Sequence, residues 1–387
     1  MKINRTYKYR INPTKEQEKI IDNYFKCTSF VRKLYHDSNN KNLDKKELAK
    51  NFVEEYEFLN TVNISSLIEA MYIESNEHKE KTKDKPKRMK QSFFMPYLIH
   101  KESFRIIDNK YLSVSKIGNI KIIYNREIPS DANIRKLTVI NNGDNKYFAA
   151  IMFERFINYD TSNLDINKSI GLDYSSNHFI VDSFGKRYDM PHYYREQLDR
   201  LTKKRRQLER MVEGSNNYLK KKIEIMRIHE KIREKRRYYL HSLSTELVNN
   251  YDYICIETLD LDKIINKNYL KISTKDNSYG EFVKMLEYKA IEKNKKIIKV
   301  DKWFPSTKKC HVCGCVRDDI NLSVKKWECK YCHSILDRDE NAAINIKEEG
   351  LRSLPMFERW MFANAKSRKT QKGPEENILL HVGYFSY

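Results

Sequence analysis

The sequence of 387 residues contains no long hydrophobic run. Its longest apolar stretches, such as Tyr253 to Ile256, are far shorter than the ~20 residues that a membrane-spanning helix needs. The start of the chain, Met1 to Arg10, also lacks the apolar core of a secretory signal. We therefore expect a soluble, intracellular protein.

Acidic residues are too few to balance the basic ones. The chain has 53 Asp and Glu against 74 Lys and Arg, which gives a formal net charge of +21. This excess repels itself in a compact state unless a polyanion offsets it, so nucleic acid is the first partner to consider. A basic peripheral membrane protein could carry the same charge. Because 40% of the residues are hydrophobic, the chain is not disordered throughout.

The cysteines do not form the even-numbered pattern of a secreted disulfide framework. The chain has seven, which favours a reducing, cytoplasmic compartment. Four of them form two Cys-x-x-Cys pairs, namely Cys310, Cys313, Cys329 and Cys332. This spacing predicts one structural Zn²⁺ ion held by four thiolates. A redox role for the thiols is the alternative, and nearby substitute ligands are Cys315, His311 and His333.

The first part of the sequence, residues 1–165, predicts a β-barrel or a β-sandwich with a helical insertion at about residues 14–100. Residues 2–12 alternate as in a strand, and Pro13-Thr14 opens a helix. Further short alternating segments are expected between Phe104 and Phe156. The basic run from Lys79 to Lys90 is expected to be a linker, with phosphate contact as the alternative.

Residues 166–350 predict a second domain with the order βββ-α-β-α-β-α, which is that of the ribonuclease H and RuvC fold. Its inserted parts are a helical hairpin at about 194–249 and a zinc ribbon at about 305–335. The fold class is therefore multidomain α+β or α/β. For the tail at 351–387, disorder is one expectation.

Three carboxylates stand where this fold can bring them together. Asp173 lies in the first strand of the second domain, Glu257 ends a buried strand, and Asp339 is expected about one residue before the last helix. Neighbouring strands are ~4.8 Å apart, so these side chains could share divalent cations. Two Mg²⁺ ions ~3.5 to 4 Å apart would clamp the attacking water and the leaving oxygen of a phosphodiester. Taken singly, an Asp after a strand is usually a turn former or a helix cap, and either Asp337 or Asp339 could be the N-cap of the last helix.

The predicted hairpin is strongly basic. Between Arg195 and Leu240 there are sixteen Lys or Arg against seven Asp or Glu. A cationic face of this kind would neutralise phosphates without reading sequence. A solvated helix surface is the alternative. The candidate nucleic-acid contacts are Lys203, Lys204, Arg205, Arg206, Arg210, Lys220, Lys221 and Lys222.

Several motifs together resemble one known family. They are Gly171 to Ser175, Ile256 to Leu259, Gly280 to Ala290, Val300 to Thr307, the cysteine pairs, and Asp337 to Ala343. These segments look like the C-terminal half of TnpB, the transposon-encoded RNA-guided nuclease related to type V CRISPR effectors. The resemblance runs from about Lys168 to Ile346.

The resemblance implies that Asp173, Glu257 and Asp339 are the catalytic triad of an Mg²⁺-dependent DNA endonuclease. It also implies that the first part of the chain is a wedge-like barrel with an inserted helical recognition region. Its implied partners are a guide RNA from the transposon end and a double-stranded DNA target with a short adjacent motif, and its implied location is prokaryotic and nucleoid-associated. The carboxylate order Asp, Glu, Asp favours hydrolysis over strand transfer, because transposases of this fold place the Glu last. Two alternatives stay open: a type V CRISPR effector of similar size, and a guided DNA-binding repressor that does not cleave.

Overall fold

The computed structural model describes residues 1–37, 44–81, 97–100, 104–141, 146–175, 178–259, 278–320 and 324–355. The chain divides into two compact units, one of Met1–Asn158 with Lys204–Ile228 and one of Tyr159–Lys203 with the residues from His229 onward. None of the described helices combines the length and the hydropathy of a membrane span. The predicted basic linker beyond Lys81 and the tail beyond residue 355 lie outside the described residues.

The first unit is built on a seven-stranded antiparallel sheet. Its strands are β1 (Lys2–Asn12), β2 (Tyr97–His100), β3 (Phe104–Ile107), β4 (Tyr111–Val114), β5 (Gly118–Ile123), β6 (Asn133–Asn141) and β7 (Tyr147–Phe156). Their order is β2-β6-β7-β1-β5-β4-β3. The strands expected at residues 2–12 and beyond Phe104 are therefore confirmed. A closed barrel is not shown, because in the described part of the chain β2 and β3 are the two edges and do not pair.

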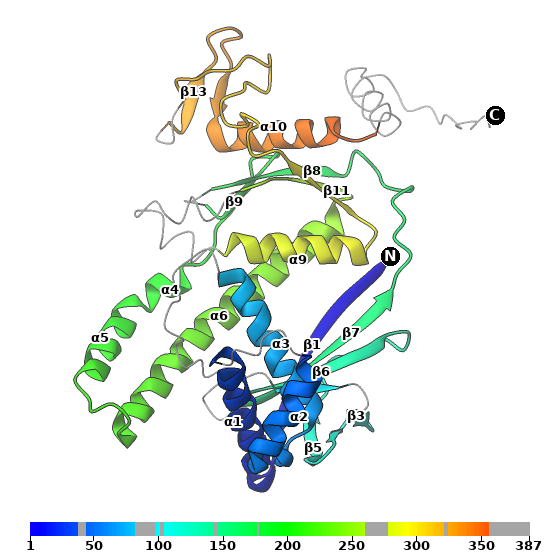
Figure 1. The fold of residues 1–387 in the computed structure, drawn as a ribbon. Helices are drawn as coiled ribbons and strands as arrows, with labels where there is room; N and C mark the ends of the chain where they lie inside the picture. Colours follow the sequence, from blue (N-terminus) through cyan, green and yellow to red (C-terminus); the bar gives the residue numbers. More distant parts are fainter. Residues whose placement is uncertain are drawn as a thin grey trace, which may run out of the picture. The chain divides into compact units, whose positions relative to one another are not determined.

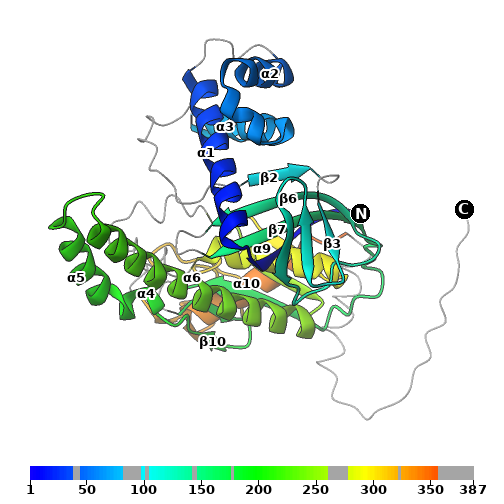
Figure 2. The ribbon, with the colours of Figure 1, turned by 90° about the horizontal axis from the view of Figure 1, so that it is seen from below.

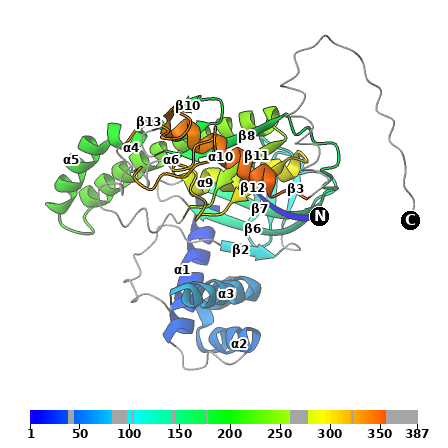
Figure 3. The ribbon, with the colours of Figure 1, turned by 90° about the horizontal axis from the view of Figure 1, so that it is seen from above.

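The helices of this unit are α1 (Lys15–Asp37), α2 (Lys45–Glu55), the short 3₁₀ helix η1 (Glu57–Thr61) and α3 (Ile64–Lys81). A reciprocal cap starts α1 where the sequence predicted a helix: the Thr14 N–H donates to the Gln17 side chain at 3.0 Å, and the Gln17 N–H donates to Thr14 Oγ1 at 3.3 Å. Figures 2 and 3 show α1 and α3 next to the edge strand β2. Buried residues of these helices and of the sheet form one hydrophobic core.

The second unit contains a five-stranded mixed sheet. Its strands are β8 (Ser169–Tyr174), β9 (Ile180–Asp182), β10 (Arg187–Tyr188), β11 (Tyr253–Glu257) and β12 (Lys296–Val300), in the order β10-β9-β8-β11-β12. The strand β11 is parallel to both β8 and β12, whereas β9 is antiparallel to its neighbours. The predicted succession of three strands and then alternating helices and strands is confirmed.

The helices that follow β10 are α4 (Tyr193–Glu196), α5 (Leu198–Glu209), α6 (Asn216–Asn250), α9 (Tyr279–Glu292) and α10 (Arg338–Arg352). The last three of these cover the two faces of the sheet. Figure 1 shows α10 along β8 and β11 on one face, with α9 on the other. The same division is visible in the core, since Ile254 and Ile256 pack with residues of α6 and α9, while Tyr253 and Cys255 pack with α10.

The last helix begins earlier than expected. The sequence placed Asp339 about one residue before the helix, but α10 begins at Arg338, so Asp339 lies in its first turn. The reason is the cap: one oxygen of Asp337 accepts the backbone N–H groups of Asp339 and Glu340, each at 3.2 Å. Asp337 is thus the N-cap, one of the two possibilities that the sequence left open.

The cysteine-rich segment lies between β12 and α10. It contains a small antiparallel pair, β13 (Lys326–Glu328) and β14 (Ile335–Asp337), and its own buried cluster that includes Trp327 and Leu336. The strand β14 ends at the cap residue Asp337 and α10 follows at once. The fold of this segment therefore sets where α10 begins.

Candidate active site and cysteine cluster

Strand alternation places two of the candidate carboxylates on the same face of the sheet. Along β11, Tyr253 and Cys255 point to the α10 side, so Glu257 continues that series. Along β8, Ile170 and Leu172 face the α6 and α9 side, which leaves Asp173 on the α10 side.

The strand register puts these two carboxylates side by side. In the parallel ladder Ile256 is opposite Leu172, and one step further aligns Glu257 with Asp173. Parallel neighbours are ~4.8 Å apart, so the two side chains emerge close together at the carboxyl end of the sheet.

Glycine at position 171 lets α10 approach the sheet closely enough to add the third carboxylate. A Cβ built on Gly171 would lie 2.0 Å from the backbone oxygen of Ala343 and 2.7 Å from Lys347 Cβ. Real Cβ contacts are essentially never below 3.0 Å. Asp339 lies one helical turn before Ala343, which is ~6 Å along the helix axis. Asp173 lies two residues beyond Gly171, which is also ~6 Å along the strand. The helix therefore carries Asp339 toward the end of β8 where Asp173 lies.

Two neighbours hold the Asp339 side chain. The Ser175 hydroxyl donates to Asp339 Oδ2 at 3.2 Å, and the Arg338 guanidinium donates to Asp339 Oδ1 through Nε at 2.8 Å and Nη2 at 2.6 Å. The cap residue Asp337 is held in turn by Arg187 of β10, whose Nη2 donates to Asp337 Oδ2 at 2.8 Å. The sequence assigned no role to Ser175, Arg338 or Arg187. The partners of Ser175 and Arg187 lie on other elements, and Arg338 contacts its neighbour Asp339 within α10.

The site is electrostatically unfavourable for carboxylates. Burial, followed by the charges of Glu257 and Asp339, raises the pKa of Asp173 well above its ordinary value, whereas Arg338 lowers it. Burial also raises the pKa of Glu257 to about 7, against the effect of a backbone hydrogen bond from Tyr174. Anionic oxygens that are crowded and desolvated in this way are suited to a hard divalent cation.

The three carboxylates are neighbours, but they are not closed around a single point. Among the described residues, the only group of three or more candidate ligands whose atoms all lie within 4.8 Å of one another is the set of four cysteines. The carboxylates repel one another, and Arg338 donates two N–H groups to Asp339 Oδ1; both interactions favour an open arrangement of the carboxylates. A cation between the carboxylates would replace their repulsion by attraction and would compete with Arg338 for Asp339.

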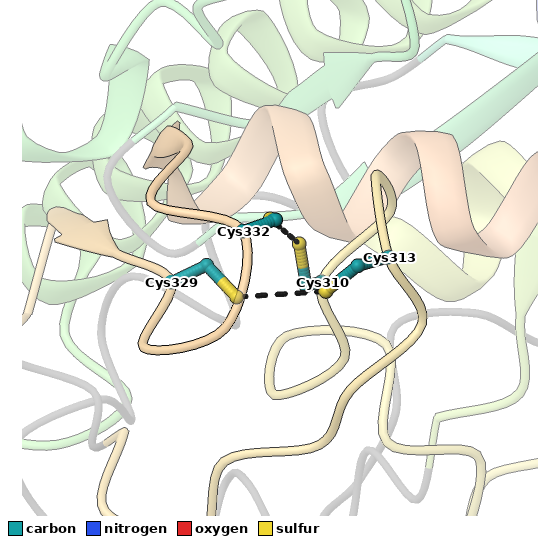
Figure 4. Close-up of side chains that lie close together, drawn as sticks. All are labelled: Cys310, Cys313, Cys329 and Cys332. Atoms are coloured by element: carbon teal, nitrogen blue, oxygen red, sulfur yellow. Dashed lines mark hydrogen bonds between the residues drawn. The ribbon is translucent and has the colours of Figure 1, made fainter.

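The four predicted cysteines do come together, as Figure 4 shows. The Cys310 and Cys332 sulfurs are 3.7 Å apart, and those of Cys313 and Cys329 are 3.6 Å apart. A tetrahedral zinc site with Zn–S bonds of ~2.3 Å has sulfur–sulfur edges of ~3.8 Å, so the cluster is compatible with structural zinc. Backbone hydrogen bonds, foremost that from Cys332, lower the pKa of Cys329 to about 5, which favours the thiolate that binds metal.

Two buried asparagines of α10 attach this cluster to the carboxylates. The side-chain N–H groups of Asn341 and Asn345 donate to the Lys309 carbonyl at 2.8 and 2.6 Å. The Asn341 oxygen accepts the backbone N–H and the ring Nδ1 of His311, both at 3.0 Å. Both asparagines are 1% exposed. Sequence reasoning noted Asn341 only as part of a motif, and its structural role could not be read from spacing.

The basic hairpin is less uniformly cationic than its sequence suggests. Lys204 of α5 and Lys221 of α6 both contact Glu224, at 2.6 and 3.1 Å, so part of their charge is balanced within the hairpin. Five of the predicted contact residues are exposed, namely Lys203, Arg205, Arg206, Arg210 and Lys220. The other three, Lys204, Lys221 and Lys222, are half-buried.

Three family models match separate parts of the chain. A model described as a probable transposase (OrfB_IS605) matches residues 156–268, and a Cas12f1-like TNB domain matches residues 279–346. A helix-turn-helix domain model (HTH_OrfB_IS605) matches residues 1–31, which in this structure form β1 and most of α1.

Relatives with assigned names point the same way. A protein of Streptomyces pristinaespiralis, whose name proposes an RNA-guided DNA endonuclease, is 31% identical over 244 residues, covering 63% of this chain and 60% of the relative. InsQ of Escherichia coli, named in the same way, is 24% identical over 63% of each chain. A TnpB-like protein, L79 of Acanthamoeba polyphaga mimivirus, is 32% identical over 35% of this chain and 27% of its own. The chain thus aligns with less than two thirds of the length of these relatives.

A solved structure shares the fold. A cryo-EM structure of a Cas12f1–sgRNA–target DNA complex superposes with a TM-score of 0.52, covering 89% of this chain and 99% of that one. The sequence identity is 14%, so the match concerns the fold. It supports a multidomain α+β architecture.

Proposed function

We propose that the chain is a member of the TnpB family and an RNA-guided DNA endonuclease that hydrolyses phosphodiester bonds with Mg²⁺. The observation that carries the proposal is the meeting of three carboxylates from separate elements: the register of β8 and β11 aligns Asp173 with Glu257, and α10 brings Asp339 toward them. The domain in question is of the RuvC type, in keeping with its mixed sheet.

The proposed metal ligands are Asp173, Glu257 and Asp339. When bound there, Mg²⁺ would supply Lewis acidity and a water activated as nucleophile. Asp173 and Glu257 are fixed by the sheet, so their spacing changes little. Ser175 keeps one oxygen of Asp339 oriented, and Arg338 holds the other. Hence the chain itself supplies a partly buried group of three carboxylates that would hold the ions.

The proposed partners follow from the family and from the charge of the chain. A guide RNA from the transposon end would select the target by base pairing, and the protein would read a short motif beside the target in double-stranded DNA. With a net charge of +21, the chain suits both polyanions. The exposed hairpin residues Lys203, Arg205 and Arg206 are proposed phosphate contacts, with Arg210 and Lys220. Lys204, Lys221 and Lys222 are weaker candidates because they are half-buried.

A structural Zn²⁺ is the second proposed cofactor. The sulfur cluster would hold it with four thiolates and no open position, so zinc would support the fold rather than react. Through Asn341 and Asn345 the zinc-binding segment would also fix the register of α10, and therefore the position of Asp339.

The test uses purified ribonucleoprotein with matched linear DNA. Cleavage is expected in Mg²⁺ and not in EDTA, and Asp173→Ala should bind guide and target while losing cleavage. The matched control is Asp189→Ala, which removes an exposed carboxylate paired with His178 at 2.6 Å. Intact DNA with the unaltered protein in Mg²⁺ would refute the nuclease proposal, and cleavage by Asp173→Ala would show that the site is elsewhere.

The match to a Cas12f1-like domain keeps one alternative in view, a type V effector of similar size. Sequencing the RNA that copurifies with the protein separates the two. One RNA derived from a transposon end supports the TnpB reading, whereas processed repeat and spacer units support the CRISPR reading.

A further inference from the structure

A fifth thiol lies against the four-cysteine cluster. Cys315 Sγ is 3.4 Å from Cys313 Sγ and 3.2 Å from Cys329 Sγ. These distances are close to the edges of the cluster itself, 3.6 and 3.7 Å. Cys315 is nevertheless outside the group whose ligand atoms all lie within 4.8 Å of one another. It therefore stands beside one edge of the tetrahedron, next to two ligands and away from the rest.

The loop that carries Cys315 also carries the most accessible ligand. Cys313 is exposed, whereas Cys310 and Cys329 are buried and Cys332 is half-buried. Only Gly314 separates Cys313 from Cys315. Gly314 has a φ of +81°, and a Cβ built on it would meet nothing within 4 Å, so the loop has room to move there. Its base is fixed, because the Cys310 N–H donates to the Cys315 carbonyl at 2.8 Å and the Gly314 N–H donates to the Cys310 carbonyl at 2.8 Å.

The nearby histidines are committed elsewhere. The ring Nδ1 of His311 contacts Asn341 Oδ1 at 3.0 Å, on the α10 side. The ring Nδ1 of His333 contacts Glu328 at 3.1 Å, and this pair is exposed. Cys315 is thus the candidate that already touches the cluster.

We propose that Cys315 is a spare zinc ligand, which takes the coordination position of Cys313 when that thiolate is lost. In the exchange a Zn–S bond to Cys315 forms and the bond to Cys313 breaks. Cys315 releases its proton to water, Cys313 takes one up, and no oxidation state changes. The site keeps four thiolates throughout, which soft-ligand zinc sites favour. This inference rests on the zinc site proposed above and is independent of the nuclease activity.

The test compares full-length chains carrying Cys313→Ser, Cys315→Ser, both changes, or Cys332→Ser. Cys332 is the matched control, since its sulfur lies beside Cys310 rather than beside Cys315. Zinc per chain is measured by mass spectrometry, and Zn²⁺ affinity by competition with a chromogenic chelator. Co²⁺ replaces Zn²⁺ as a spectroscopic probe, because the thiolate-to-cobalt absorption reports the number of sulfur ligands.

We expect Cys315→Ser to bind zinc as the unaltered chain does. Cys313→Ser should keep one zinc, with affinity reduced by no more than ~100-fold and with a four-thiolate Co²⁺ spectrum. The double variant and Cys332→Ser should lose zinc, with affinity reduced by ~1,000-fold or more.

Other results overturn the inference. Equal loss of zinc from Cys313→Ser and from the double variant would show that Cys315 does not substitute. Loss from Cys315→Ser alone would make it an obligatory ligand rather than a spare one. An unaltered chain without zinc would overturn the zinc site and this inference together.

Discussion

Replacing Gly171 by alanine tests how α10 delivers Asp339. The new Cβ would lie 2.0 Å from the Ala343 oxygen and 2.8 Å from the Lys347 nitrogen. Ordinary contact begins at 3.4 Å. Both neighbours are helix backbone, which cannot rotate away as a side chain could, so the helix itself must retreat by roughly 1 Å or more. The helix also lies close to the sheet at Gly350, where an added Cβ would lie 2.5 Å from Cys255 Sγ.

Two losses of different size are expected from Gly171→Ala. Overpacking costs ~1 to 3 kcal/mol, which for a unit of this size lowers the Tm by roughly 2 to 10 °C. The displacement of Asp339 should cost more, since a misplacement of ~1 Å at a reacting centre can reduce the rate ~100-fold. The assays are thermal unfolding and single-turnover cleavage of matched DNA, both with saturating guide RNA.

The control is Gly118→Ala in the first unit. That residue has a φ of +87° and its nearest neighbour is Gln17 Nε2 at 3.9 Å, so alanine there introduces backbone strain without a clash. It should lower the Tm by a comparable few degrees and leave cleavage intact. If Gly171→Ala matched this control in both assays, the close approach of α10 would not be what positions the third carboxylate.

Three further predictions follow from particular contacts. Asp337→Ala should lower the free energy of unfolding by ~1 kcal/mol, because the α10 cap is lost. Asp337→Asn can still cap the helix but loses the charge that faces Arg187, so it should keep most of that stability in thermal melts. Equal effects of the two variants would argue against capping. Asn345→Ala should remove one of the two amide donors to the Ser306 and Lys309 carbonyls, the other being Asn341, and should cost ~0.5 to 1.5 kcal/mol and speed zinc release to a chelator. Unchanged release would uncouple α10 from the cysteines. Burial lowers the pKa of Lys289 to about 8, so between pH ~8 and ~10.4 the unfolded chain holds this proton more tightly than the folded chain does. The free energy of unfolding should therefore rise with pH across that window. Lys289→Met should flatten this rise in denaturant titrations, and an unchanged slope would contradict the role given to Lys289.

The sequence predicted local features well where each depended on neighbouring residues. The alternation in β1, the cap at Thr14 and the continuous apolar run of β11 all depend on a few adjacent positions. The start of α10 was predicted too late, because its cap requires Asp337 to accept from two N–H groups in a turn whose apolar signal comes afterwards. The seven strands of the first unit could be anticipated, but whether their edges close into a barrel depends on long-range pairing that no local pattern encodes.

In the candidate site, too, the sequence predicted some residues and could not predict others. Asp173, Glu257 and Asp339 could be selected because they end or follow recognisable elements. Ser175, which orients Asp339, carries no pattern of its own, since its role depends on α10 lying beside the end of β8. Arg338 is next to Asp339 in the sequence, but the spacing alone does not show that the two side chains pair. Likewise the Cys-x-x-Cys spacing predicted four ligands, whereas the proximity of Cys315 to two of them is visible only in three dimensions.

The two glycines that let α10 settle on the sheet have a consequence for how this fold can diverge. Docking of the helix depends on Gly171, Gly350 and Cys255, and none of these is a carboxylate. A descendant that exchanged its acidic residues for neutral ones would therefore keep its architecture and be relieved of charge repulsion. Under the proposed function, one substitution of a carboxylate would remove cleavage and leave the docking of α10 intact, which is a short evolutionary route from cutting DNA to occupying it.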